Sequence, residues 1–279
     1  REAEQLAPAL EGGGPILAEL YLVRWEEARQ AGEKVLASLL TDAQHFLKPG
    51  GIVASVVVST LDKVIASILQ DSPKVAIVAH TTSKNHSVFH YTFKEDIGQQ
   101  EFRPALHRDV YDRSRASLSL PKADHELKTA RGVPEFDTLS YQTKLLIEML
   151  TKHSGKKINV ATVINPGQGH LAVAVHGLYD PDHLTLVDRD LLALRYSLKN
   201  VSVYAHPFDQ VHLIHSPKFD GVQGNTSDLI VLTLRGDEPS AVTSSQLDGS
   251  LDSLSLDGIS IVGGSSTRVT RIEKLVRLR

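Results

Sequence analysis

The chain contains 279 residues, with a formal net charge of −3 and no cysteine. This length is more than one core usually organises, so two domains of ordinary size are expected. The small net charge argues against a uniformly basic nucleic-acid-binding protein, although a local basic patch remains compatible with it. The lack of cysteine excludes disulfides, thiolate metal sites and cysteine nucleophiles.

Hydrophobic residues make up 41% of the chain and charged residues 23%, which are values of a globular protein. No apolar run reaches the length of a membrane span and no signal peptide is visible, so we expect a cytoplasmic protein. The chain starts at Arg1 rather than at methionine, which is compatible with a fragment or with a trimmed chain.

The first part of the chain, residues 1–96, alternates predicted strands and helices. A strand is expected over residues 18–25 and a helix over 28–46, which ends at a Pro-Gly-Gly turn. Residues 52–59 are a β-branched run, typical of a strand covered on both faces. A helix to residue 69 and strands over 75–79 and 88–93 follow. This series is typical of one half of an α/β sheet.

Residues 97–135 are polar, and we interpret them as a linker and the opening hairpin of a second domain, residues 136–279. In that domain helices are expected over 141–150, from 170, over 191–198 and over 241–254. Strands are expected over 158–164, 184–187, 201–205, 229–234 and 259–262. This alternation predicts a doubly wound parallel sheet with right-handed crossovers.

The two halves resemble each other in their closing portions. Residues 18–23 correspond to 227–232, and residues 47–51 correspond to 254–258. Either any two α/β halves look alike, or one unit was duplicated and its first copy serves as a scaffold without a nucleotide-binding turn.

One constellation in the second half suggests a cofactor site. The strand over 158–164 ends in Asn165-Pro166-Gly167-Gln168-Gly169, and the next strand ends in Asp188. Residues 160–200 thereby resemble the cofactor half of class I S-adenosylmethionine-dependent methyltransferases, whose motif is D-x-G-x-G-x-G. Aligned on the last glycine, the chain keeps Gly167 and Gly169 and places Asn165 at the first glycine and Val163 at the acidic position.

The resemblance implies roles for two further carboxylates. Asp188 follows Gly169 by nineteen residues, where the family's carboxylate accepts hydrogen bonds from both ribose hydroxyls. The alternative is that Asp188 only caps the next helix. Residues 193–200 also resemble the family's second helix, A-L-x-x-S-x-x-N. Asp209 is the candidate for the contact near the adenine. The resemblance thus implies a cofactor site formed by Asn165, Gly167, Gly169, Asp188 and Asp209.

The layout further resembles the two-lobed ribosomal RNA guanine-N2 methyltransferases, in which a degenerate lobe precedes a catalytic one. Their N-P-P-F motif accepts hydrogen bonds from the exocyclic amine, and here Thr233-Leu234-Arg235-Gly236 replaces it. Thr233 can accept such a bond, whereas Arg235 cannot. The resemblance implies that Thr233, Arg235 and Asp237 face the methyl acceptor. The pair Asp237-Glu238 otherwise serves to cap the following helix.

Two remaining features have competing interpretations. His206, His212 and His215 have a spacing compatible with a metal, but loop histidines explain them better, so no metal site is expected. The basic residues at the C-terminus either contact RNA phosphates or form a solvated helix face; they are Arg268, Arg271, Lys274, Arg277 and Arg279.

The resemblance therefore implies an α/β protein with a Rossmann-like class I methyltransferase fold, duplicated with an incomplete first lobe. Residues 1–96 would be that scaffold lobe and residues 136–279 the cofactor-binding domain. The first hypothesis for function is an S-adenosylmethionine-dependent methyltransferase acting on ribosomal RNA. The second is a catalytically inactive module of the same fold that binds RNA or a protein partner. A dinucleotide-dependent enzyme fits less well because the three-glycine motif is broken.

Overall fold

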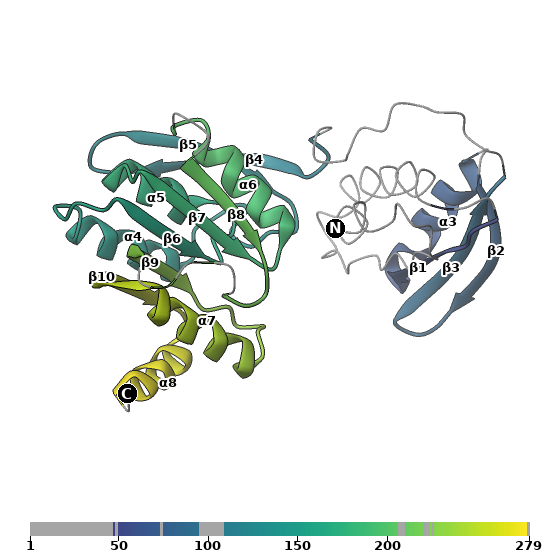
Figure 1. Cartoon of the computed structure of the whole chain (residues 1–279). Helices are drawn as coiled ribbons and strands as arrows, with labels where there is room; N and C mark the ends of the chain where they lie inside the picture. Colours follow the sequence, from purple (N-terminus) through teal and green to yellow (C-terminus); the bar gives the residue numbers. More distant parts are fainter. Residues whose placement is uncertain are drawn as a thin grey trace. The chain divides into compact units, whose positions relative to one another are not determined.

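The structure is a computed structural model that describes residues 47, 50–72, 75–94, 109–205, 210–219, 222, 224 and 226–277. The chain divides into two compact units, residues 1–111 and 112–279, which are treated separately below (Figure 1). The strand expected over 18–25, the helix expected over 28–46, residues 18–23 of the proposed repeat and Asp209 lie outside the described residues. Within the described ranges, no helix is long and apolar enough to cross a membrane.

The first unit contains a three-stranded antiparallel sheet in the order β1-β3-β2. Its elements are β1 (Val53–Val58), a 3-10 turn η2 (Ser59–Leu61), α3 (Asp62–Asp71), β2 (Val75–Thr82) and β3 (His86–Phe93). They agree with the predicted helix and strands, but the strands pair antiparallel. β1 was expected to be covered on both faces, yet its burial alternates and Val56 is 43% exposed. Its buried face packs with Ile65 and Leu69 of α3.

The second unit begins with a hairpin formed by β4 (Asp112–Ser119) and β5 (Asp124–Ala130). Two buried amide side chains attach β5 to the rest of the unit. Asn200 accepts from the Lys128 N–H at 2.8 Å and donates to the Lys128 carbonyl at 2.9 Å. Gln168 makes the same paired contact with the backbone of Ala130, at 2.8 and 3.0 Å. The hairpin therefore belongs to the second unit by its contacts.

A five-stranded parallel sheet forms the centre of the second unit, in the order β10-β9-β6-β7-β8. Its strands are β6 (Val160–Ile164), β7 (His183–Asp188), β8 (Val211–His215), β9 (Ser227–Thr233) and β10 (Leu254–Gly263). From β6 the chain proceeds outward through β7 to β8, then returns to β9 on the other side of β6. The order of strands thus reverses between β6 and β9, which confirms the predicted doubly wound parallel sheet.

Helices cover both faces of this sheet (Figure 1). On one face lie α4 (Tyr141–Lys152), α5 (His170–Tyr179) and α6 (Leu191–Val201), whose buried residues pack with Ala161, Val163 and Leu186. On the other lie α7 (Ser240–Ser253) and α8 (Ser266–Arg277), which pack with Ile164 and Ile230. Burial on both faces explains why the parallel strands read as continuous apolar runs.

One predicted strand of the second domain is wrong. Residues 201–205 were expected to form the third strand, but α6 continues through Val201 and ends in a turn, and the strand is β8 (Val211–His215). The Tyr204 and Ala205 N–H groups both donate to the Val201 carbonyl, at 2.9 Å. Val201 and Ala205 both pack into the core. The apolar residues of 201–205 that suggested a strand are therefore buried at the end of a helix.

Candidate functional site

The sheet brings the chain segments that follow β6, β7 and β9 together at one edge. Parallel strands end on the same side, and the reversal of strand order opens a crevice there in α/β proteins. Asn165 follows β6, Asp188 ends β7 and Thr233 ends β9. Three of the residues assigned to the site from the sequence are therefore neighbours at the reversal point, although they lie 23 and 45 positions apart in the chain.

The turn after β6 has the backbone conformation of a glycine-rich loop. Asn165, Gly167 and Gly169 have positive φ values of 58°, 59° and 97°. At Gly169 a Cβ atom would lie 2.8 Å from the Ser197 Cα on α6, so only glycine allows this approach. At Gly167 a Cβ atom would meet nothing within 4 Å. The loop is thus packed against α6 at one glycine and has free space beside the other.

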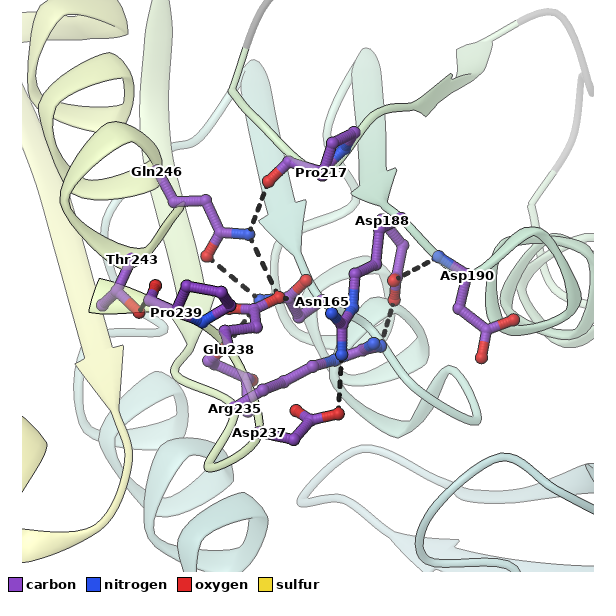
Figure 2. A network of polar contacts seen from close by, with 12 residues as sticks. Asn165, Asp188, Asp190, Pro217, Arg235, Asp237, Glu238, Pro239, Thr243 and Gln246 are labelled. Carbon is purple, nitrogen blue, oxygen red and sulfur yellow. Dashed lines mark hydrogen bonds and ion pairs between the residues drawn. The ribbon is translucent and has the colours of Figure 1, made fainter. Parts of the chain in front are cut away.

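Asp188 is buried and ion-paired rather than open. It is 1% exposed, and its carboxylate accepts from the Arg235 guanidinium at 2.6 Å and from the Asp190 N–H at 2.8 Å (Figure 2). Burial raises the pKa of Asp188 to about 6, while Arg235 acts in the opposite direction. Because β6 lies between β7 and β9, this ion pair spans the end of β6.

The alternative role of Asp188 as a helix cap is excluded by its neighbour. The Asp190 side chain accepts from the Leu192 N–H at 3.0 Å and from the Ala193 N–H at 3.3 Å, so Asp190 is the N-cap of α6. Asp188 is consequently left for the contact with Arg235.

Asp237 and Glu238 do not cap α7 either, since its N-cap residue is Pro239 and its first turn has no acidic residue. Asp237 is largely exposed and accepts from Arg189 at 2.6 Å. Glu238 is 3% exposed and accepts from Gln246 at 3.4 Å. Burial raises the pKa of Glu238 above its usual value, and Arg235 and Arg189 lower it.

Asn165 connects these groups. Its side-chain N–H donates to the Thr233 carbonyl at 2.8 Å. It also donates to Gln246 Oε1 at 3.3 Å (Figure 2). The structure therefore joins Asn165, Asp188, Arg235 and Asp237 into one polar network with residues that the sequence analysis did not assign to the site. Arg189, Glu238 and Gln246 are the main additions.

These additions differ in whether a sequence signal could have found them. Arg189 directly follows the strand-terminal Asp188, and Glu238 belongs to the acidic pair Asp237-Glu238, for which contact with a substrate amine was the alternative to capping the next helix. Gln246 sits in a helix rich in small polar residues and carries no sequence signal.

Four buried side-chain atoms at this edge have no hydrogen-bond partner among the described residues. They are Asn165 Oδ1, His170 Nδ1, Thr233 Oγ1 and Glu238 Oε2. His170 opens α5 directly after Gly169, and burial lowers the pKa of its imidazole. Unpartnered buried polar atoms are rare in folded proteins, and a cluster of them marks a place where a ligand or ordered water is expected. No group of metal-ligating side chains occurs in the part of the chain that the structure describes.

The residues fit S-adenosylmethionine only in part. Gly167 lies in a loop with space beside it, but each oxygen of Asp188 already accepts one hydrogen bond, from the Asp190 N–H and from Arg235. Since the Asp188 side chain is 0% exposed and that of Arg235 is 16% exposed, a ribose can reach the carboxylate only after Arg235 moves.

Comparisons with known proteins give matches among solved structures alone. No family model matches the chain, and no curated protein matches it. A 16S rRNA guanine-N2 methyltransferase of T. thermophilus, solved with AdoMet and guanosine, is 15% identical with a TM-score of 0.59. The match covers 83% of this chain and 62% of that one, so the chain spans less than two thirds of that enzyme's length.

Two further structures show the same kind of match at lower scores. The ribosomal protein L11 methylase of Lactobacillus delbrueckii subsp. bulgaricus is 20% identical over 49% of this chain and 67% of its own, with a TM-score of 0.39. The N-methyltransferase NodS of Bradyrhizobium japonicum, in complex with S-adenosyl-L-homocysteine, is 14% identical over 51% and 68%, with a TM-score of 0.38. Together with the parallel sheet, the first match shows that the chain has the fold of the class I methyltransferases.

Proposed function

We propose that the second unit is a methyltransferase-fold module that no longer transfers methyl groups and that acts by binding RNA. The observation that supports this is the 2.6 Å contact between Arg235 and the buried Asp188. The guanidinium occupies the carboxylate that the family resemblance assigns to the cofactor's ribose. This is the second of the two hypotheses that the sequence raised.

The two free energies of the exchange nearly cancel. Removing one partner of a buried ion pair costs about 3–5 kcal/mol. Two ribose hydroxyls that donate to a carboxylate return about 1.5–3 kcal/mol each. The ribose contact, which anchors the cofactor in active members of the fold, thus adds little net affinity while Arg235 holds Asp188.

The acceptor side supports the same conclusion. The Thr233 carbonyl accepts from Asn165 at 2.8 Å, and the Thr233 hydroxyl oxygen is buried. Leu234 is buried and Arg235 points to Asp188, so the buried Thr233 hydroxyl is the one side-chain acceptor that this segment can offer to an exocyclic amine. Base-amine methylation of the family's kind therefore lacks its usual groups here.

RNA is proposed as the partner from the likeness to an rRNA enzyme, which is an argument by fold. The C-terminal basic stretch supports it less than the charge pattern suggested. The Arg268 guanidinium donates to Thr243 and to the carbonyls of Gly236 and Glu238, and Arg271 donates to Ser240. Both arginines thus have partners within the unit.

An active S-adenosylmethionine-dependent RNA methyltransferase is the other candidate function. The four unpartnered polar atoms and the space beside Gly167 favour it. In that case Asn165, Gly167, Gly169, Asp188 and Asp209 bind the cofactor. Thr233, Arg235 and Asp237 then face the methyl acceptor.

Calorimetric titration with S-adenosylmethionine and S-adenosylhomocysteine separates the two candidates. A closed module shows no heat at millimolar ligand. Micromolar binding that disappears in Asp188→Asn, but not in the exposed control Asp257→Asn, would instead establish a working cofactor site. Circular dichroism of each variant confirms that the fold is intact, and a filter-binding assay with ribosomal RNA fragments tests the RNA partner.

A further inference from the structure

The exposed apolar side chains of the second unit gather on two adjoining elements, α4 and β10. Of the large hydrophobic residues that are exposed in the described part of this unit, only Val203 lies elsewhere; the others are Tyr141, Leu145, Met149 and Leu256. The two elements touch, because a Cβ atom on Gly263 of β10 would lie 2.7 Å from the Leu146 side chain of α4. Exposed hydrophobic residues that gather on one surface, rather than lying singly, indicate an interaction site.

The exposed face of α4 has charges that complement a copy of themselves. The apolar residues Tyr141, Leu145 and Met149 recur every four positions and therefore lie on one side of the helix. The same side carries three exposed charged residues at the same spacing, which are Lys144, Glu148 and Lys152. Because the acid lies midway between the two lysines, two copies of α4 that pack antiparallel place the acid of each beside a lysine of the other.

β10 forms one edge of the five-stranded sheet, with β9 as its strand neighbour among the described residues (Figure 1). Residues 259–263 pair regularly with β9, and the Gly263 carbonyl accepts from the Leu234 N–H at 2.7 Å. Alternate residues of a parallel strand bond to the same neighbour, so the backbone groups of Ser260 and Val262 point away from β9. No proline or charged residue occurs within 259–263, so this part of the edge lacks the usual protection against pairing with another strand.

A second copy of the same edge supplies partners for these backbone groups. When two β10 strands pair antiparallel about Ile261, Ser260 of each lies opposite Val262 of the other, and both pairs exchange N–H and C=O bonds. This arrangement has two-fold symmetry, as most homodimers have. Since α4 packs against β10, the same symmetry places the two α4 helices antiparallel on one face of the joined sheet.

We propose that β10 and the exposed face of α4 bind a second copy of this chain by edge-to-edge strand pairing, which joins two five-stranded sheets into one. A second copy fits this surface because one symmetry operation satisfies the open strand edge and the charges of α4 together. The inference goes beyond the proposed function, because it assigns a partner to residues that take no part in the polar network around Asp188.

The test is sedimentation-velocity ultracentrifugation of the whole chain over a range of micromolar concentrations, where we expect a dimer. Leu145→Lys places a charge in the apolar face of α4 and is expected to raise the dissociation constant about tenfold or more. Val203→Lys makes the same change at an exposed residue outside this surface and is expected to leave the dimer unchanged. Ser260→Pro removes an N–H that points away from β9, so it should weaken the dimer while the monomer stays folded by circular dichroism.

Charge reversal on α4 separates pairing between copies from a general loss of stability. Glu148→Lys gives a face with lysine alone, and Lys144→Glu combined with Lys152→Glu gives a face with glutamate alone. Each variant is expected to dimerise more weakly than the parent protein, because like charges then meet across the two-fold axis. An equimolar mixture of the two is expected to dimerise again, since each face meets its complement.

Three results would overturn the proposal. A monomer at every concentration would mean that another part of the chain or a different partner covers this surface. A dimer that both Leu145→Lys and Ser260→Pro leave intact would place the contact between copies elsewhere. Failure of the mixed charge variants to associate, with both folded, would exclude the antiparallel packing of α4 on which the pairing depends.

Discussion

The substitution Arg235→Ala tests the closed cofactor site most directly. It removes the guanidinium that lies 2.6 Å from Asp188 and spans the end of β6. The carboxylate side chain is 0% exposed, so the substitution leaves an uncompensated buried acid and is expected to destabilise the unit by about 3–5 kcal/mol. In the variant, a ribose that binds Asp188 no longer has to break the ion pair with Arg235, so this cost of about 3–5 kcal/mol is absent from the binding free energy. Affinity for S-adenosylhomocysteine is therefore expected to rise by about a hundredfold or more.

The assay is isothermal titration at about pH 8 and again at about pH 9, because the pKa of Asp188, about 6 with Arg235 in place, rises further once this guanidinium is removed. Arg195→Ala is the matched control, because Arg195 is exposed on α6, away from the strand ends. Adding Asp188→Ala to Arg235→Ala should remove the gained affinity. A folded Arg235→Ala variant that binds S-adenosylhomocysteine no better than the parent protein would refute the reasoning that Arg235 closes the site.

Three further predictions follow from the contacts around the site. Gly169→Ala places a side chain at a positive φ and against α6, so urea denaturation should show a free energy of unfolding lower by about 2 kcal/mol or more. The control is Gly155→Ala, where an added Cβ meets nothing within 4 Å and the free energy should change by less than about 0.5 kcal/mol. Asn200→Ala removes both contacts with the Lys128 backbone and should cost about 3 kcal/mol, with early proteolysis of the β4–β5 hairpin as the second readout. The folded pKa of Asp188 is raised from 3.8 to about 6, so its contribution to stability is complete below the lower value and is lost as the pH rises through the higher one. Thermal unfolding between about pH 4 and pH 7 should therefore show a loss of about 3 kcal/mol relative to Asp188→Asn, and parallel curves for the two proteins would contradict it.

The second domain was largely predictable because its signals are local. Strands buried on both faces give continuous apolar runs, and the carboxyl ends of such strands carry Asn165 and Asp188. The third strand was misplaced because Val201 and Ala205 are buried at the end of a helix, and an apolar alternation does not distinguish that burial from a strand. In the first unit, apolar runs also predict the strands, but they do not indicate whether neighbouring strands pair parallel or antiparallel. The structure shows that they pair antiparallel.

Sequence alone determined the alternation of strands and helices in the second unit, the glycine turn after β6 and the acid at the end of β7, since each depends on residues close in the chain. Only the tertiary structure decided what that acid contacts. Arg235 lies 47 positions from Asp188, and the two meet because β9 and β7 flank β6 in the sheet. The burial that makes this ion pair strong enough to close the site is likewise a property of the assembled sheet and helices.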